Sequence, residues 1–401
     1  MRRLCASISL ALLLSGCPAR RSPVGAEPSG LPSSAPPASS AALDAGTLDA
    51  GPDGGDAGAT ASADLPIFVT WAREGAHVAV ADHAWVTLTD VRDPAKTARL
   101  GPHPKRVTAV TWSDDAKQVV TAADDGALRL WSADGGPPRA TWQAHVNELP
   151  SACFSHGGSL FAASFSLANQ DAFVAVWSTA TGDSVSSTKL EDSSSPYWQL
   201  AFRADDRTLV GFDATTVVMQ DPATGATRKR RSFNTGATSP VALSPDGAAA
   251  ATAEEMHALV VWRVDEEKQK TLVTVSDCQS HMTGVHFSPD ARFLLVHSQA
   301  GWWRSFNVPS FSPRSTWRPK TPEEGADATM SDDGTTVLRV APDRTIEIVD
   351  ADTGKELRAL EGKMPEGETP RFSTDHHHVA VGGPDPAVWD IQTGRRTPLP
   401  R

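Results

Sequence analysis

A repeat of about 42 residues runs through most of this 401-residue chain and limits the folds open to it. Runs of β-forming residues end at eight regularly spaced positions, namely Trp71, Trp112, Phe154, Phe202, Leu243, Phe287, Met330 and Phe372. The successive spacings are 41, 42, 48, 41, 44, 43 and 42 residues. A fixed period of this length indicates one supersecondary unit copied around a ring or along a stack, because each unit buries its apolar face against its neighbours.

The second unit shows the composition of the repeat. Residues 107–112, 118–122, 127–131 and 139–142 are short β-forming runs, and turns rich in Asp and Gly separate them. The Ser-x-Asp-Gly-like turn after the first run recurs at 244–247, 288–291 and 331–334. This chemistry is typical of tight turns between antiparallel strands. The sequence therefore predicts an all-β fold whose unit is a four-stranded antiparallel sheet.

These units resemble the WD-repeat β-propeller family over roughly residues 65–401. Blades of that family carry a His before the first strand, an Asp before the third strand and a Trp at its end. The resemblance implies that these three residues bond to one another and lock the blade. Two units match the pattern at equal spacing, with His103, Asp125 and Trp131 in the second and His145, Asp171 and Trp177 in the third.

Eight units predict a propeller of eight blades, with seven as the alternative because seven is the commonest number in this family. The last unit ends in Thr397-Pro398-Leu399-Pro400, which is a poor strand since proline donates no ladder hydrogen bond. We therefore expect the ring to close with a borrowed N-terminal segment or with a frayed final strand.

The first 64 residues differ in composition from the repeats. Residues 1–16 have a basic start and an apolar run too short to span a bilayer, which is typical of a signal peptide. Leu14-Ser15-Gly16-Cys17 resembles a bacterial lipobox, so Cys17 is the expected lipidation site, against an ordinary secretory cleavage as the other interpretation. Residues 17–64 then comprise the lipidated N-terminus and a disordered tether rich in Ala, Pro, Ser, Gly and Asp.

The charge distribution argues against nucleic acid as a partner. Residues 22–72 hold six acids and no Lys or Arg, and these acids carry over half of the net charge of −11. The repeat region is only mildly acidic and lacks the basic surface that phosphate recognition needs.

Candidate catalytic and metal-binding residues are few. His376-His377-His378 places only two imidazoles on one strand face, a poor set for zinc, and a solvated turn is the better interpretation. Neither a nucleophile motif nor a phosphate-binding Gly loop appears. We therefore expect no enzyme activity, no cofactor, no metal site and no small-molecule substrate.

Two surface features remain. Arg228-Lys229-Arg230-Arg231 should lie on an exposed outer strand, where charge blocks sheet-to-sheet association or contacts anionic lipid headgroups. Three tryptophans, Trp85, Trp198 and Trp302, lie near the face that carries the turns into the first and third strands. They are candidate anchors for a protein partner, or residues that pack between blades.

Together these features predict a lipoprotein whose propeller is a non-catalytic protein-interaction scaffold in the bacterial envelope. Its partners would be envelope proteins, with the membrane reached through the N-terminal lipid. Pro18 rather than Asp follows Cys17, which by resemblance to lipoprotein sorting favours the outer membrane. The alternatives are a quinoprotein-like or sugar-cleaving propeller enzyme and an outer-membrane assembly factor.

Overall fold

The computed structural model describes residues 68–401 with short gaps. The gaps fall at 74, 145–147, 168–170, 191–195, 198, 213–215, 233–239, 255–257, 265–268, 275–281, 289, 299–301, 318–327, 332, 342, 366–369 and 374–376. The proposed signal peptide, Cys17 and the proposed tether lie outside the described residues. None of the described residues forms a helix long and apolar enough to cross a membrane.

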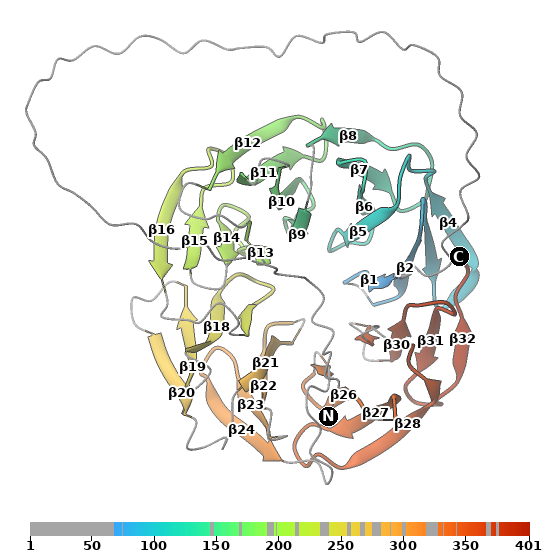
Figure 1. The fold of residues 1–401 in the computed structure, drawn as a ribbon, viewed down its shortest axis with the longest axis vertical. Helices are drawn as coiled ribbons and strands as arrows, with labels where there is room; N and C mark the ends of the chain where they lie inside the picture. The colour runs from blue at the N-terminus through green and yellow to red at the C-terminus, as the bar shows by residue number, and fades with distance from the viewer. Residues whose placement is uncertain are drawn as a thin grey trace, which may run out of the picture. The chain divides into compact units, whose positions relative to one another are not determined.

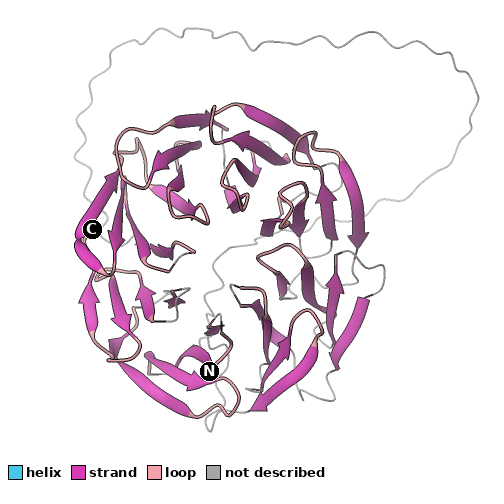
Figure 2. Ribbon diagram, turned by 180° about the vertical axis from the view of Figure 1, so that it is seen from behind, coloured by secondary structure: helices cyan, strands magenta, loops and turns pink. Residues whose placement is uncertain are grey.

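The described residues form an eight-bladed β-propeller, in which eight four-stranded antiparallel sheets surround a central channel (Figure 1). Figure 2 shows the same ring from behind, built of strands and loops. Each blade consists of four strands that are consecutive in the chain, so the first strand lies innermost and the fourth outermost. The prediction of an all-β fold with eight blades, rather than seven, is confirmed.

Blades 1 to 4 follow one another from the N-terminal side. Blade 1 contains β1 (Phe68–Trp71), β2 (His77–Asp82), β3 (Trp85–Asp90) and β4 (Asp93–Leu100). Blade 2 contains β5 (Val107–Trp112), β6 (Gln118–Ala123), β7 (Ala127–Ser132) and β8 (Ala140–Gln143). Blade 3 contains β9 (Glu148–Phe154), β10 (Leu160–Ser166), β11 (Ala172–Ser178) and β12 (Ser184–Lys189). Blade 4 contains β13 (Gln199–Phe202), β14 (Leu209–Phe212), β15 (Thr216–Gln220) and β16 (Thr227–Ser232).

Blades 5 to 8 complete the ring. Blade 5 contains β17 (Val241–Leu243), β18 (Ala249–Glu254), β19 (Ala258–Arg263) and β20 (Gln269–Thr274). Blade 6 contains β21 (Met282–Phe287), β22 (Phe293–Ser298), β23 (Trp303–Asn307) and β24 (Ser312–Trp317). Blade 7 contains β25 (Ala328–Met330), β26 (Thr336–Val340), β27 (Thr345–Asp350) and β28 (Glu356–Lys363). Blade 8 contains β29 (Arg371–Phe372), β30 (His378–Val381), β31 (Ala387–Asp390) and β32 (Arg396–Pro398).

The turn after each inner strand is held by a buried serine in most blades. In blade 2 the Ser113 hydroxyl donates to the Asp115 carboxylate at 2.7 Å and accepts the Gln118 backbone N–H at 3.0 Å. Equivalent Ser-to-Asp bonds of 2.6–2.7 Å recur at Ser244, Ser288 and Ser331. A local side chain therefore satisfies backbone groups that the tight turn leaves unpaired, which explains why this tetrapeptide repeats.

The hydrophobic core is divided among the junctions between blades. Eight clusters of buried side chains occur in the described residues, and each cluster lies between two neighbouring blades. Every blade is therefore stabilised by apolar contacts on both faces, as expected for a unit that cannot bury its core alone. These contacts fix the inner strand ends around the channel.

Among the strands that the structure describes, none is exchanged where the ring closes, and the two end blades meet by packing. Within the described residues, blade 8 is completed by its own short β32, in which Pro398 lies opposite Ala387. Leu399 is buried with Val78 and Val388 between blades 8 and 1. We expected either a borrowed N-terminal segment or a frayed final strand. The eighth sheet, as described, contains no N-terminal strand, and its final strand, β32, is short but paired with β31.

Candidate functional site

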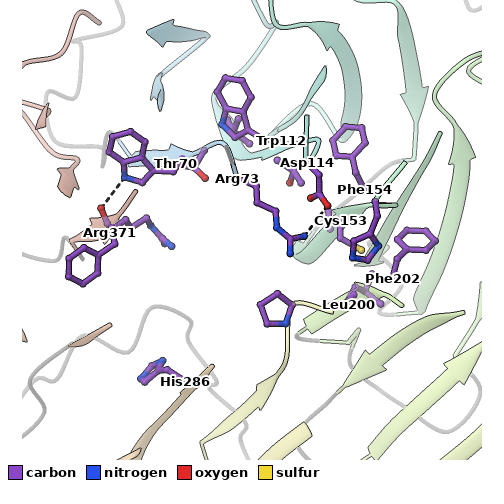
Figure 3. A pocket seen from close by; sticks show the side chains of 18 of the residues that line it. Thr70, Arg73, Trp112, Asp114, Cys153, Phe154, Leu200, Phe202, His286 and Arg371 are labelled. Atoms are coloured by element: carbon purple, nitrogen blue, oxygen red, sulfur yellow. Dashed lines mark hydrogen bonds and ion pairs between the residues drawn. The ribbon is translucent and has the colours of Figure 1, made fainter. Parts of the chain in front are cut away.

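The channel opens into a cavity of about 720 Å³ at the ends of the inner strands (Figure 3). Its walls combine aromatic edges with charged side chains. The aromatic residues close inner strands of five blades, and they are Trp71, Trp112, Phe154, Phe202 and Phe372. The charged and titratable residues are Arg73, Asp114, His156, His286 and Arg371. We call this cavity the channel mouth.

Polar contacts tie neighbouring blades together around the channel mouth. The Arg73 guanidinium lies 2.9 Å from the Asp114 carboxylate and joins blades 1 and 2. The Trp71 indole N–H donates to the Arg371 carbonyl at 2.9 Å and joins blades 1 and 8. The edge of the channel mouth is thus held across two blade junctions, which fixes the positions of these side chains.

A third tie joins blades 3 and 4. The Asp206 carboxylate accepts the backbone N–H groups of His156 and Gly157 at 2.8 and 2.9 Å, and it lies 3.0 Å from His156 Nδ1. Burial opposes the charge on Asp206, but these donated hydrogen bonds outweigh it and hold the pKa of the carboxyl below its usual value. Asp206 is therefore ionised at neutral pH and orients the His156 ring at the channel mouth.

Cys153 also lines the channel mouth, next to the inner strand end of blade 3. Burial raises the pKa of its thiol to about 12. The thiol stays protonated at neutral pH and does not supply the thiolate that nucleophilic catalysis needs.

An aromatic stack extends outward from the channel in blade 6. The His286 ring faces the channel and lies parallel to the buried His297 ring at 5.6 Å, and His297 stacks on Trp303 at 4.7 Å. Gly284 makes room for this stack, since a Cβ atom there would lie 1.8 Å from His297 Nε2. Burial lowers the pKa of His297 to about 3, and His286 adds to the decrease, so the His297 ring is neutral at physiological pH.

The charged residues of the channel mouth were not among the residues predicted from the sequence. Arg73, Asp114, His156 and Pro245 each stand two residues after an inner strand end, and all four line the cavity. The repeat itself therefore carried the signal. Reading that one position in every unit would have collected the rim residues of four blades.

In blade 2, the predicted residues His103 and Trp131 both contact Thr121, which was not among the predicted residues. The Trp131 indole donates to Thr121 Oγ1 at 2.9 Å, and His103 Nε2 lies 2.7 Å from the same oxygen. His103 Nδ1 lies 2.9 Å from the Ala84 carbonyl of blade 1, so it donates and Nε2 accepts the Thr121 hydroxyl. Burial lowers the pKa of His103, which keeps the ring in this neutral form.

Asp125 takes a different partner from the one that the resemblance implies. Both of its carboxylate oxygens accept hydrogen bonds from the buried Arg129 guanidinium, four residues along the chain. Burial disfavours the charge, but the bonds from Arg129 outweigh it and lower the pKa of the Asp125 carboxyl. His103 and Trp131 therefore form one connected group, and Asp125 braces the turn beside it.

The third blade is held largely by aromatic packing. Trp177 stacks on Trp142 at 5.1 Å and on Phe161 at 6.0 Å. Asp171 forms an ion pair with Lys189 at 2.7 Å. His145 lies outside the described residues.

Of the candidate partner-binding tryptophans, the structure describes two, Trp85 in blade 1 and Trp302 in blade 6. Trp85 is half-buried, with the Arg99 guanidinium 4.1 Å above its ring and Gly101 against it. Trp302 is partly buried, and its backbone N–H donates to Ser298 Oγ at 3.3 Å. Trp198 lies outside the described residues. These three residues remain a prediction.

The basic run on β16 contributes to a blade junction. Lys229 Nζ and the Arg231 guanidinium lie 5.4 and 5.5 Å from the Trp262 ring of blade 5, and Arg228 pairs with Asp221. Cation–π contacts of this kind add to packing between blades. The run therefore has a structural use that the sequence analysis did not consider.

No three or more His, Cys, Asp or Glu side chains converge on one point in the part of the chain that the structure describes. Of the His376-His377-His378 segment, His376 lies outside that part. His378 lies on β30 with its ring 6.2 Å from that of Trp71.

Comparisons with known proteins identify the repeat. Residues 95–132 match the model of the WD domain, G-beta repeat. A 75-residue segment is 37% identical to cell division cycle 20.4, cofactor of APC complex, from Arabidopsis thaliana; it covers 19% of this chain and 17% of that relative. Residues 95–132, which extend from β4 to β7, thus resemble a WD repeat.

Two solved structures share the fold. The computationally designed Ika8 protein superposes with a TM-score of 0.59 at 20% identity, over 81% of this chain and 96% of its own. The C-terminal WD40 domain of Sif2 superposes with a TM-score of 0.60 at 14% identity, over 80% and 96%. Propellers built from WD repeats generally mediate protein–protein interaction and are typically not enzymes.

Proposed function

We propose that this protein is a membrane-anchored scaffold of the bacterial envelope, which binds partner proteins at the channel mouth of its propeller. The lipid would be carried by Cys17, and the outer membrane is the proposed location. The propeller would supply recognition and no chemistry.

The channel mouth is the observation that carries the proposal. It presents Trp71 and Trp112 beside the guanidinium groups of Arg73 and Arg371 in one hollow. Tryptophan and arginine are the residue types most enriched at the energetic centres of protein interfaces. The ties across the blade junctions hold these groups in place before a partner arrives, so less ordering entropy is lost on binding.

The N-terminal segment supports the anchor. A 47-residue chain (18–64) rich in Gly, Ser and Ala has a root-mean-square reach of about 40 Å if it behaves as a flexible coil. This reach would let the propeller meet partners away from the lipid surface while it stays attached.

Affinity capture from detergent-solubilised envelopes tests the interaction. The variant Arg73→Ala/Arg371→Ala removes two cations from the channel mouth. The control Lys96→Ala/Lys363→Ala removes two cations from β4 and β28, which are outer strands. We expect the mouth variant to lose at least tenfold of the captured partner while the control retains it. Equal capture by both variants would refute a partner site at the channel mouth.

A further inference from the structure

A second cavity, of about 240 Å³, lies at the junction where blade 8 meets blade 1. In Figure 1, β32 (red) runs beside β4 (blue) at this junction. Val91 and Pro94 form apolar parts of its wall on the side of blade 1. Most of its polar lining comes from blade 8, namely His378, Asp390, Thr393, Arg395 and Thr397. We call it the junction pocket.

The strand register of blade 8 places these polar residues on the face that looks toward blade 1. Asp390 lies opposite His378 of β30, and its backbone N–H donates to the Arg395 carbonyl at 3.0 Å. Residues that lie opposite each other in an antiparallel pair project from the same face of a sheet. Trp389, the residue before Asp390, packs on the other face against blade 7. The charged side chains of this end of blade 8 therefore share the junction with blade 1.

The Asp390 carboxylate carries the negative charge of the junction pocket. Its Oδ1 accepts the backbone N–H and the hydroxyl of Thr393 at 2.7 and 2.9 Å. Burial opposes the charge, but the hydrogen bonds from Thr393 outweigh it and the nearby His378 adds to their effect, so the pKa of the carboxyl lies below its usual value. Asp390 is therefore ionised at neutral pH, and no ion pair with a lysine or arginine neutralises it among the described residues.

Asp390 has counterparts in three other blades, because an aspartate also ends the third strand or follows it in blades 1, 4 and 7. In blade 1, the two oxygens of Asp90 accept hydrogen bonds from the Arg92 guanidinium, at 3.0 and 3.2 Å. In blade 4, Asp221 forms an ion pair with Arg228. The chain thus supplies a guanidinium for each of these two carboxylates.

The counterpart in blade 7 also lies near an arginine. A hydrogen bond from the Thr353 hydroxyl lowers the pKa of the Asp350 carboxyl, and the charge of Arg314 from blade 6 adds to the decrease. In blade 8, Gln392 stands where blade 1 has its arginine, and the junction pocket borders Asp390. Of the four aspartates, Asp390 is therefore the one for which no arginine partner is present among the described residues.

We propose that the junction pocket binds one arginine side chain of a partner protein, with its guanidinium against the Asp390 carboxylate. The planar guanidinium matches the geometry of a carboxylate and forms strong charge-assisted hydrogen bonds with it. A volume of about 240 Å³ is below the range of drug-sized ligand pockets and suits a single side chain, whose methylene groups would lie along Val91 and Pro94. The inference rests on the proposed scaffold function for the source of that side chain.

Arg395 also lines the junction pocket, and its position is compatible with a bound cation. The residue is exposed, so its charge lies in water, where the high dielectric constant weakens the repulsion of a second cation. An anionic ligand would instead meet the ionised, partly buried Asp390. The charges of the pocket therefore favour a cation in contact with Asp390.

Titration of the purified full chain with N-acetyl-L-arginine methylamide, whose only charge is the guanidinium, tests the junction pocket directly. We expect saturable shifts in the methyl NMR signals of Val91 and Thr397, which line the pocket. Asp390→Asn keeps an acceptor for Thr393 and removes the charge, so it should weaken binding by at least about tenfold, the worth of one hydrogen bond to a charged group. Asp221→Asn is the matched control, because Asp221 holds the same position in blade 4 but is paired with Arg228. It should bind the probe as the native chain does.

Two further measurements separate a cation site from other kinds of pocket. The citrulline analogue of the probe is uncharged, so native protein should bind it at least about tenfold more weakly, whether or not any variant folds. Arg395→Ala removes a cation and should bind the arginine probe at least as tightly as native protein. Absence of saturable shifts, equal binding of the two probes, equal losses in Asp390→Asn and Asp221→Asn, or weaker binding in Arg395→Ala would overturn the proposal. None of these results touches the capture experiment on Arg73 and Arg371, so the two proposals fail separately.

Discussion

Thr121 is the residue through which His103 and Trp131 meet, and its hydroxyl serves two buried partners at once. The spacing of His103 and Trp131 along the chain predicted that they belong to one group in blade 2. Spacing along the chain does not show that Thr121 lies between the two rings. The position of Thr121 depends on the register of β6 against β5 and β7.

Replacing Thr121 by Val should therefore destabilise the propeller by about 2 kcal/mol, because it leaves a buried indole N–H and a buried imidazole nitrogen unpaired. Thr87→Val makes a matched control, since the Thr87 hydroxyl is equally buried but has no hydrogen-bond partner. Urea denaturation should show a lower midpoint for the first variant and a native-like midpoint for the second. Equal midpoints would show that the group around Thr121 contributes nothing to stability.

The buried His297 makes the free energy of unfolding depend on pH. Its folded pKa of about 3 lies below the ordinary value of 6.5, so between these values the unfolded chain binds a proton that the folded protein does not. Stability should fall as the pH drops from 6.5 toward 3, by up to about 1.4 kcal/mol for each pH unit. Measured between pH 6.5 and 5, the slope should be smaller in His297→Phe than in the native protein. An unchanged slope would contradict a neutral, buried His297.

Gly284 is required by the same stack. Gly284→Ala places a methyl group 1.8 Å from His297 Nε2, so the stack must move and the melting temperature should fall by several degrees. Gly157→Ala adds the same methyl group with its closest neighbour at 3.4 Å and should leave the melting temperature nearly unchanged. A native-like melting temperature for Gly284→Ala would show that the stack is not closely packed.

The strands and their turns were the part of the fold that could be predicted from the sequence. The four runs of the second unit correspond to β5 to β8, and the recurring serine turn lies after the inner strand where expected. Such features are local, since they depend on turn residues and alternation within one unit. Contacts between blades depend on residues that lie in different repeat units, and no local pattern gives them. Lys229 and Arg231 against Trp262 are an example.

The junction of blades 8 and 1 depends on packing of elements from the two ends of the propeller. Leu399 follows β32 and is buried between these blades, whereas Leu357 on β28 is 54% exposed. Leu399→Ala should cost about 2–3 kcal/mol, and Leu357→Ala should change stability by less than about 0.5 kcal/mol. Thermal unfolding of the two variants measures both effects. Similar melting temperatures would mean that Leu399 does not hold the ring closed.

At the scale of the whole molecule, the eight-fold repeat predicted the ring of blades. The residues of the channel mouth explain how such a ring could recognise a partner. The partner itself could not be predicted, because the rim draws single residues from separate blades. Arg73, Asp114 and His156 come from three successive units and share a position after the inner strand but no residue type.

The proposed anchor leads to a prediction about the whole molecule. Cys17→Ala should move the protein from the membrane fraction to the soluble fraction of cells, because no cysteine remains at the position of the proposed lipid. Cys153→Ala, at the channel mouth, should leave the distribution unchanged. Membrane retention of Cys17→Ala after a high-salt wash would contradict lipid attachment at this residue.

The central claim is that the channel mouth contacts a partner protein in the cell, and site-specific photo-cross-linking in intact cells tests it most directly. A photoreactive residue replaces Arg371 at the channel mouth or, as the control, Leu357 on the exposed outer strand of blade 7. We predict one discrete cross-linked envelope protein from position 371 and none from position 357. The same adducts from both positions, or none from position 371, would contradict the claim.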